Sequence, residues 1–93
     1  MPWVISSRAA GLARESACGL RLEVRPGPVN LPPMLLDFFF EEAAPGDHVE
    51  FRAEGVRIWV PSHLSWLADN DVVIEAAADG HVHGIVEDVR RPY

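Results

Sequence analysis

The sequence predicts a small, mainly β domain of the α+β class, with small sheets packed against one helix. Several segments alternate apolar and polar residues with the two-residue period of a half-buried strand. Glu54-Gly55 and Asp79-Gly80 are two-residue turn signals that divide these segments into hairpins. Two other segments repeat their apolar residues at helical spacing. We expect the order strand, helix, four strands, short helix and β-hairpin, in a single domain over residues 1–93.

The N-terminal part predicts a strand, a helix and a second strand. Trp3 to Ile5 is a short apolar run typical of an edge strand. Ser6-Ser7 offers a helix N-cap, and the mostly small apolar residues that follow at i, i+3, i+4 and i+7 suit a helix packed close to a sheet. Gly19 is expected to end this helix in the left-handed conformation. Residues 20–25 then alternate apolar and charged side chains, which predicts a strand.

Residues 34–40 predict a strand with apolar side chains on both faces. A stiff loop precedes it, because residues 26–33 hold four prolines. Leu35 and Phe39 lie on the second face, which a single layer leaves uncovered. We therefore expect another layer of the domain, or a second copy of the chain, to cover Leu35 and Phe39. A homodimer through this face is the favoured alternative.

The segment 46–67 shows the plan of the chain most clearly. Folding it about Glu54-Gly55 pairs Phe51 with Ile58 and puts the apolar side chains of both strands on one face. Pro61 ends the second strand because it has no N–H to donate. Ser62 is expected to cap a short helix that buries Leu64, Leu67 and Ala68.

The other face of this hairpin carries charged residues around one aromatic side chain. Arg52 and Arg57 lie opposite each other, so we expect a carboxylate, Glu23 or Glu50, between them. Trp59 among these charges indicates either a contact surface or an ordinary amphipathic strand.

The rest of the chain predicts a second hairpin, residues 72–87, around Asp79-Gly80, and frayed residues at 90–93.

Composition excludes several classes of function. Asp and Glu total 14 against 8 Arg and no Lys, and the net charge is −6, so we expect no binding to nucleic acid or to anionic membranes. No apolar run reaches the ~18 residues that span a bilayer, and we see no signal peptide. The one cysteine forms no internal disulfide, so a cytoplasmic location is expected.

A few residues are candidates for chemistry. His81 and His83 share a strand face, opposite Ala78 and Ala76 if the turn has two residues, and could meet one metal ion; otherwise they are solvent-facing histidines. Cys18 could be a reactive thiol or a small residue at a helix end. Asp37 could be a perturbed acid or a carboxylate at an edge or interface. No catalytic set is present, and we do not predict an enzyme.

The order and spacing of several motifs resemble the HesB/IscA-like family, the A-type iron–sulfur carriers. The matching segments are Leu20-Arg21-Leu22-Glu23-Val24, Leu36-Asp37-Phe38, Gly46-Asp47, Gly55 to Val60 and Leu64 to Leu67. The resemblance covers roughly residues 3–88 and implies the HesB-like fold.

The family's ligands do not carry over. Its members hold iron or a cluster with three cysteines, one in the loop after the first long strand and two near the C-terminus. The corresponding segments here, 26–33 and 86–93, contain no cysteine, and Cys18 matches no ligand position. The sequence therefore predicts a divergent relative without cofactor, acting as a non-catalytic binding or assembly module with an unidentified protein partner. The alternative is a metal-binding protein that uses His81 and His83 in place of cysteines.

Overall fold

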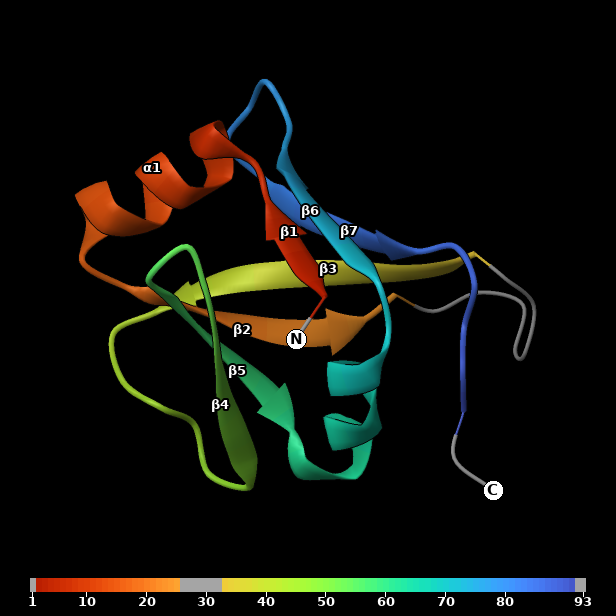
Figure 1. Cartoon of the computed structure of the whole chain (residues 1–93). Helices are drawn as coiled ribbons and strands as arrows, with labels where there is room; N and C mark the ends of the chain where they lie inside the picture. Colours follow the sequence, from red (N-terminus) through yellow and green to blue (C-terminus); the bar gives the residue numbers. More distant parts are fainter. Residues whose placement is uncertain (1, 26–32, 92–93) are drawn as a thin grey trace.

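The computed structural model describes residues 2–25 and 33–91, so most of the predicted proline loop and the last two residues lie outside the described part. The predicted order of elements is confirmed (Figure 1). The elements are β1 (Trp3–Ile5), α1 (Ser7–Ser16), β2 (Gly19–Val24), β3 (Met34–Glu41), β4 (His48–Ala53), β5 (Val56–Pro61), the 3-10 helix η1 (Ser62–Asp69), β6 (Val72–Ala76) and β7 (Val82–Val86). Neither helix of the described residues has the length and apolar character needed to cross a membrane.

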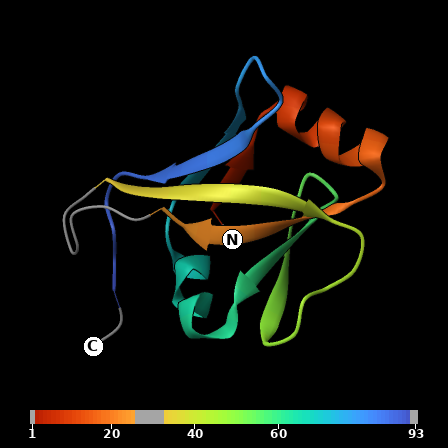
Figure 2. The ribbon, with the colours of Figure 1, turned by 180° about the vertical axis from the view of Figure 1, so that it is seen from behind.

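The α+β class is confirmed, and the strands form one curled sheet where the sequence indicated small sheets. Their order is β1-β6-β7-β3-β2-β5-β4, with parallel pairs at β1–β6 and β2–β5 and antiparallel pairs elsewhere. Figure 2 shows β3 between β7 and β2, where it joins the two halves of the sheet. The curl brings the edge strands together, because the ring of Trp3 on β1 meets Phe51 on β4 edge to face at 5.4 Å.

The core fills the concave side of this sheet. α1 and η1 lie at opposite ends of it (Figure 1). Ala9 and Ala13 of α1 and Leu67 of η1 are at most 1% exposed, which confirms the close packing expected of small helical side chains. The indole Nε1 of Trp3 donates a hydrogen bond to the Leu67 carbonyl at 3.0 Å, so β1 is tied to η1.

The central hairpin has the predicted register. Phe51 pairs with Ile58, and Arg52 lies opposite Arg57. Of the two expected carboxylates, Glu50 contacts one member of this pair: its Oε2 accepts from Arg52 Nε at 3.1 Å, whereas the Arg57 guanidinium lies over the Trp59 ring. Glu23 instead pairs with Arg21.

The predicted end of α1 was wrong. Ser6 is the N-cap as expected, since its Oγ accepts from Ala9 N–H at 3.1 Å. At the other end Ala17, not Gly19, takes the left-handed conformation, with φ 53°. Gly19 is the first residue of β2. A Cβ there would lie 2.6 Å from two ring carbons of Trp59, so close packing, not φ, requires glycine at this position.

Two predictions about the second half are also corrected. Ser62 does not cap η1 with its side chain; its N–H and Oγ both donate to the Asp47 carbonyl at 3.0 Å, joining η1 to the β3–β4 connection. Residue 90 is not frayed, because the buried Asn70 accepts from Arg90 N–H at 2.6 Å and donates to Arg90 O at 3.0 Å. Both contacts join segments distant in sequence.

The turn between β6 and β7 has three residues, Ala78 to Gly80, and not two. Ala77 N–H donates to the His81 carbonyl at 2.8 Å and closes the loop, and Gly80 has φ 90°. This length sets His83 opposite Glu75 instead of Ala76. The one-residue difference puts a carboxylate beside an imidazole where the sequence indicated alanine.

Candidate functional site

The convex side of the sheet carries an apolar row across four adjacent strands. Val4 pairs with Val73, Val73 with Ile85, and Ile85 with Leu35. These four residues, which we call the outer row, come from β1, β6, β7 and β3. Val4 is 62% exposed, Val73 41% and Leu35 38%, so no element of the described chain covers the row.

Phe39 lies on the same face of β3, on the far side of Asp37 from Leu35. It is 38% exposed, with the Arg21 guanidinium 5.0 Å and the His81 ring 6.4 Å from its ring centroid. Within residues 2–25 and 33–91 no second layer lies over Leu35 or Phe39. Cover by a second copy of the chain stays a prediction.

Trp59 does not belong to an accessible surface, although it lies on the predicted outer face of β5. It is 1% exposed. Its ring packs against Gly19, and the Arg57 guanidinium lies 5.3 Å from its centroid. Its Nε1 has no hydrogen-bond partner among the described residues. The missing side chain of Gly19 makes the space that buries the indole, so the predicted contact role of Trp59 was wrong.

Asp37 links polar groups from three segments on this face. Its carboxylate accepts from Arg25 at 2.7 and 3.3 Å, and its Oδ1 lies 2.9 Å from His81 Nε2. The Arg25 hydrogen bonds lower the pKa of Asp37 to about 2; burial opposes the shift, and the His81 contact adds to it. Asp37 is therefore ionised at neutral pH and serves as an ion-pair partner, which excludes it as a general acid.

His81 and His83 lie side by side as the strand pattern predicted. Their rings are nearly parallel, at 14°, with centroids 6.3 Å apart. The Asp37 carboxylate contacts His81 Nε2 and orients the His81 ring, as carboxylates do for metal-binding histidines. The rings stack instead of converging on one point, and the described residues hold no group of three metal-ligating side chains.

The donor set for an iron–sulfur cluster does not fit this chain. Such clusters take thiolates, or two thiolates with two histidines. Cys18 is half-buried between α1 and β2, with its Sγ donating to the Ser16 carbonyl at 3.2 Å. A single thiol in this position supplies one ligand at most, and the sequence has no other cysteine.

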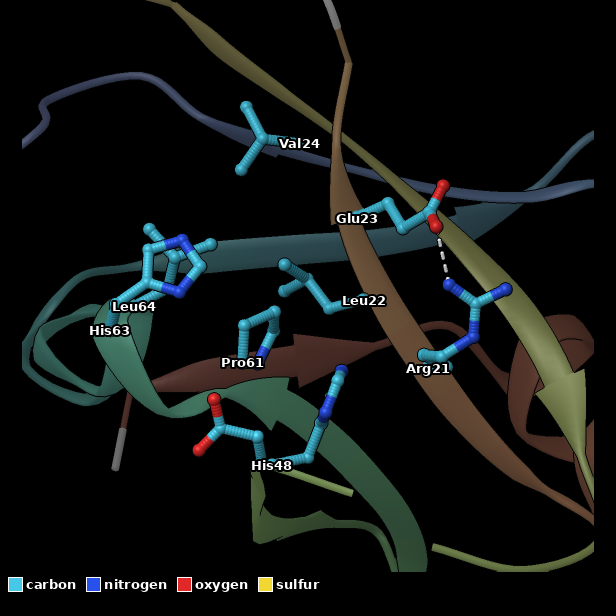
Figure 3. A pocket seen from close by; sticks show the side chains of 9 residues that line it. Arg21, Leu22, Glu23, Val24, His48, Pro61, His63 and Leu64 are labelled. Carbon is cyan, nitrogen blue, oxygen red and sulfur yellow. Dashed lines mark hydrogen bonds and ion pairs between the residues drawn. The ribbon is translucent and has the colours of Figure 1, made fainter. Parts of the chain in front are cut away.

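A hollow of about 510 Å³ lies between the end of β2 and η1 (Figure 3). The sequence did not indicate it, because its walls come from three separate segments of the chain. It is lined by residues 21–24 of β2, by Asp47 and His48 before and at the start of β4, by Pro61, and by His63 and Leu64 of η1. Side chains of both polarities therefore surround it.

Comparisons with known proteins relate this chain to others by structure alone. No protein-family model and no curated protein sequence matches it. The crystal structure of Escherichia coli SufA, involved in the biosynthesis of iron–sulfur clusters, superposes with a TM-score of 0.60 at 16% identity; the match covers 96% of this chain and 82% of SufA. A solution NMR structure of an Aquifex aeolicus protein gives a TM-score of 0.57 at 16% identity, and the match covers 99% of this chain and 93% of that one. The chain therefore has a HesB/IscA-like fold, and the resemblance inferred from its motifs is confirmed at the level of the fold.

Proposed function

We propose that this protein is a non-catalytic binding or assembly module built on the fold of an iron–sulfur carrier, without the carrier's cluster ligands. The observation that carries the proposal is the combination of a SufA-like fold with a single thiol, Cys18, placed at a helix end. With one thiol in place of the set of thiolates that a cluster requires, the chain lacks the means to hold a cluster.

The convex face supports the binding part of the proposal. The outer row and Phe39 expose apolar side chains beside the Arg25–Asp37–His81 contacts. Apolar groups rimmed by polar ones are typical of protein contact surfaces. We propose that a second copy of the chain binds there through Leu35 and Phe39.

Anaerobic reconstitution with iron and sulfide tests the loss of the cluster. We expect colourless protein after desalting, with neither stoichiometric iron nor acid-labile sulfide. Cys18→Ser serves as the control and should behave in the same way. A stable brown wild-type protein whose colour is lost in Cys18→Ser would contradict the proposal, because it would make Cys18 a cluster ligand.

The alternative, metal binding by His81 and His83, has one observation in its favour. Asp37 holds His81 by Nε2 and leaves Nδ1 available. The stacked rings oppose it, because two imidazoles that ligate one ion must direct their nitrogens to a common point.

A further inference from the structure

β2 extends beyond its partner β5 beside the hollow. The ladder between them pairs Arg21 with Trp59 and then stops; β5 continues to Pro61, which has no N–H to donate, and the chain turns into η1. β2 continues to Val24, paired on its other side with β3. Past Arg21, the β5 side of β2 has no strand partner within the described part of the chain.

The direction of the backbone groups on this edge follows from one hydrogen bond. Arg25 N–H donates to the Leu35 carbonyl at 2.9 Å, so the backbone of Arg25 points toward β3. Backbone groups of successive strand residues point alternately to the two sides. The N–H and C=O of Val24 therefore point away from β3 and into the hollow, where an extended peptide could pair with them.

The polar groups of the lining are two carboxylates, two histidines and one arginine. The carboxylates are Asp47 and Glu23, and the histidines are His48 and His63. His48 Nδ1 lies 2.7 Å from the Gly46 carbonyl, to which it can only donate, so Nε2 is the ring nitrogen left for another partner. Arg21, the one arginine of the lining, is paired with Glu23 at 2.5 Å and with Glu41 at 2.8 Å. The lining thus favours a cationic donor.

The apolar lining suits the stem of a long basic side chain. Val24 is 39% exposed, and Pro61 and Leu64 are half-buried. Lysine and arginine lay their methylene groups along such surfaces while the charged head reaches polar groups. The two hydrogen bonds from Ser62 to the Asp47 carbonyl tie one wall of the hollow to the start of η1. A net charge of −6 also favours association with a basic partner.

We propose that this hollow binds an arginine or lysine side chain of an extended segment of a partner protein, and that the segment's backbone pairs with the open edge of β2 at Val24. The proposal uses none of the residues of the outer row, and it does not depend on whether the domain lacks a cluster.

Titration of ¹⁵N-labelled protein with a short synthetic peptide tests it. The probe is acetyl-Thr-Val-Arg-Val-Thr-amide, and the comparison peptide has glutamate in place of arginine. We expect the arginine peptide to shift the amide signals of residues 22–24, 47–48 and 62–64, with a Kd of about 1 mM or below. The glutamate peptide should shift none of them. N-acetylargininamide, which lacks the flanking residues, should bind at least about fivefold more weakly than the peptide, because it cannot pair along β2.

Matched variants separate charge from backbone pairing. Glu23→Gln with Asp47→Asn should weaken binding by about fivefold or more and reduce its salt dependence; asparagine tolerates the left-handed backbone of Asp47. Glu42→Gln with Asp69→Asn removes the same charge outside the hollow and should leave the affinity unchanged. Val24→Pro removes the N–H that points into the hollow and should also weaken binding, with the amide spectrum reporting whether the variant is folded.

Four results would overturn the proposal: no shifts at about 5 mM arginine peptide, equal binding of the glutamate peptide, shifts confined to the outer row, or equal affinity for N-acetylargininamide. The last would make the hollow a site for a small guanidinium compound.

Discussion

Asp37 is the residue on which the polar contacts of the convex face depend. It combines a two-point contact with Arg25 and a contact with His81, and its side chain is 20% exposed. The strand pattern alone showed only a carboxylate among apolar residues. It allowed a perturbed acid or a carboxylate at an edge or interface; the pKa is perturbed, but downward, as in an ion-pair partner and not as in a general acid.

The pH dependence of stability should reveal this ion pair. The pKa of Asp37 is about 2 in the folded protein, against an ordinary value of 3.8. A carboxylate whose pKa is lowered by folding stabilises the protein above its unfolded pKa and loses this contribution as pH falls through the folded value. We expect Asp37→Asn to reduce the free energy of unfolding by about 1 kcal/mol at pH 7, after allowance for the exposure of Arg25. The difference in this free energy between wild type and variant should vanish as the pH falls from about 4 to about 2.

Urea unfolding of both proteins across this range measures the effect. Glu42→Gln, at an exposed carboxylate, is the control and should show no such dependence. A difference between wild type and Asp37→Asn that does not change with pH would contradict the prediction.

His81 and His83 are predicted to bind zinc only weakly at neutral pH. The Asp37 contact occupies one nitrogen of His81, and the stacked rings direct their remaining nitrogens to no common point. Isothermal titration with zinc should give small heats. A stoichiometric, submicromolar site that disappears in His83→Ala would refute this and favour the metal-binding alternative.

At the scale of elements, the contact between β2 and β5 depends on one glycine. The ring of Trp59 occupies the space that a side chain at Gly19 would take. A Cβ at this position would also lie 3.1 Å from the Arg57 carbonyl oxygen. We expect Gly19→Ala to destabilise the fold by about 1–3 kcal/mol, because either the indole or the strand must move.

Gly11 provides the matched control for this change. It lies in α1, and a Cβ there would meet nothing within 4 Å. Gly11→Ala should therefore stabilise the protein by up to about 1 kcal/mol through helix propensity. Thermal unfolding compares the two variants. Equal effects would show that Trp59 does not pack against β2 as described.

For the whole molecule, we predict a homodimer through the convex face. Sedimentation or light scattering should show that the wild-type protein associates as its concentration increases. The variants Leu35→Glu and Phe39→Glu should be monomeric, because a carboxylate in an apolar interface loses its solvation. Phe40→Glu is the control, since Phe40 is equally exposed at 38% but points to the other side of β3. A wild-type monomer whose stability is unchanged by Phe39→Glu would contradict the prediction.

Local patterns determined most of the elements and one register. The alternation of residues 49–60 and the Glu54-Gly55 turn predicted the β4–β5 hairpin residue by residue, because both signals act within one short segment. The small residues of α1 likewise predicted its close packing. The motif order further predicted the HesB/IscA-like fold that the structural comparisons confirm.

Contacts between distant segments decided the rest. A turn one residue longer than predicted places Glu75 opposite His83. The missing side chain of Gly19 leaves the space in which the Trp59 ring is buried. Neither the length of a turn nor the space beside a strand can be read from a two-residue signal. The joining of the hairpins into one sheet, the carboxylate beside His81 and the hollow beside β2 each require strands far apart in the chain. Sequence by itself determined which faces are apolar, because side-chain period is a local property. Only the tertiary structure decided which of those faces are covered, because cover depends on where other segments pack.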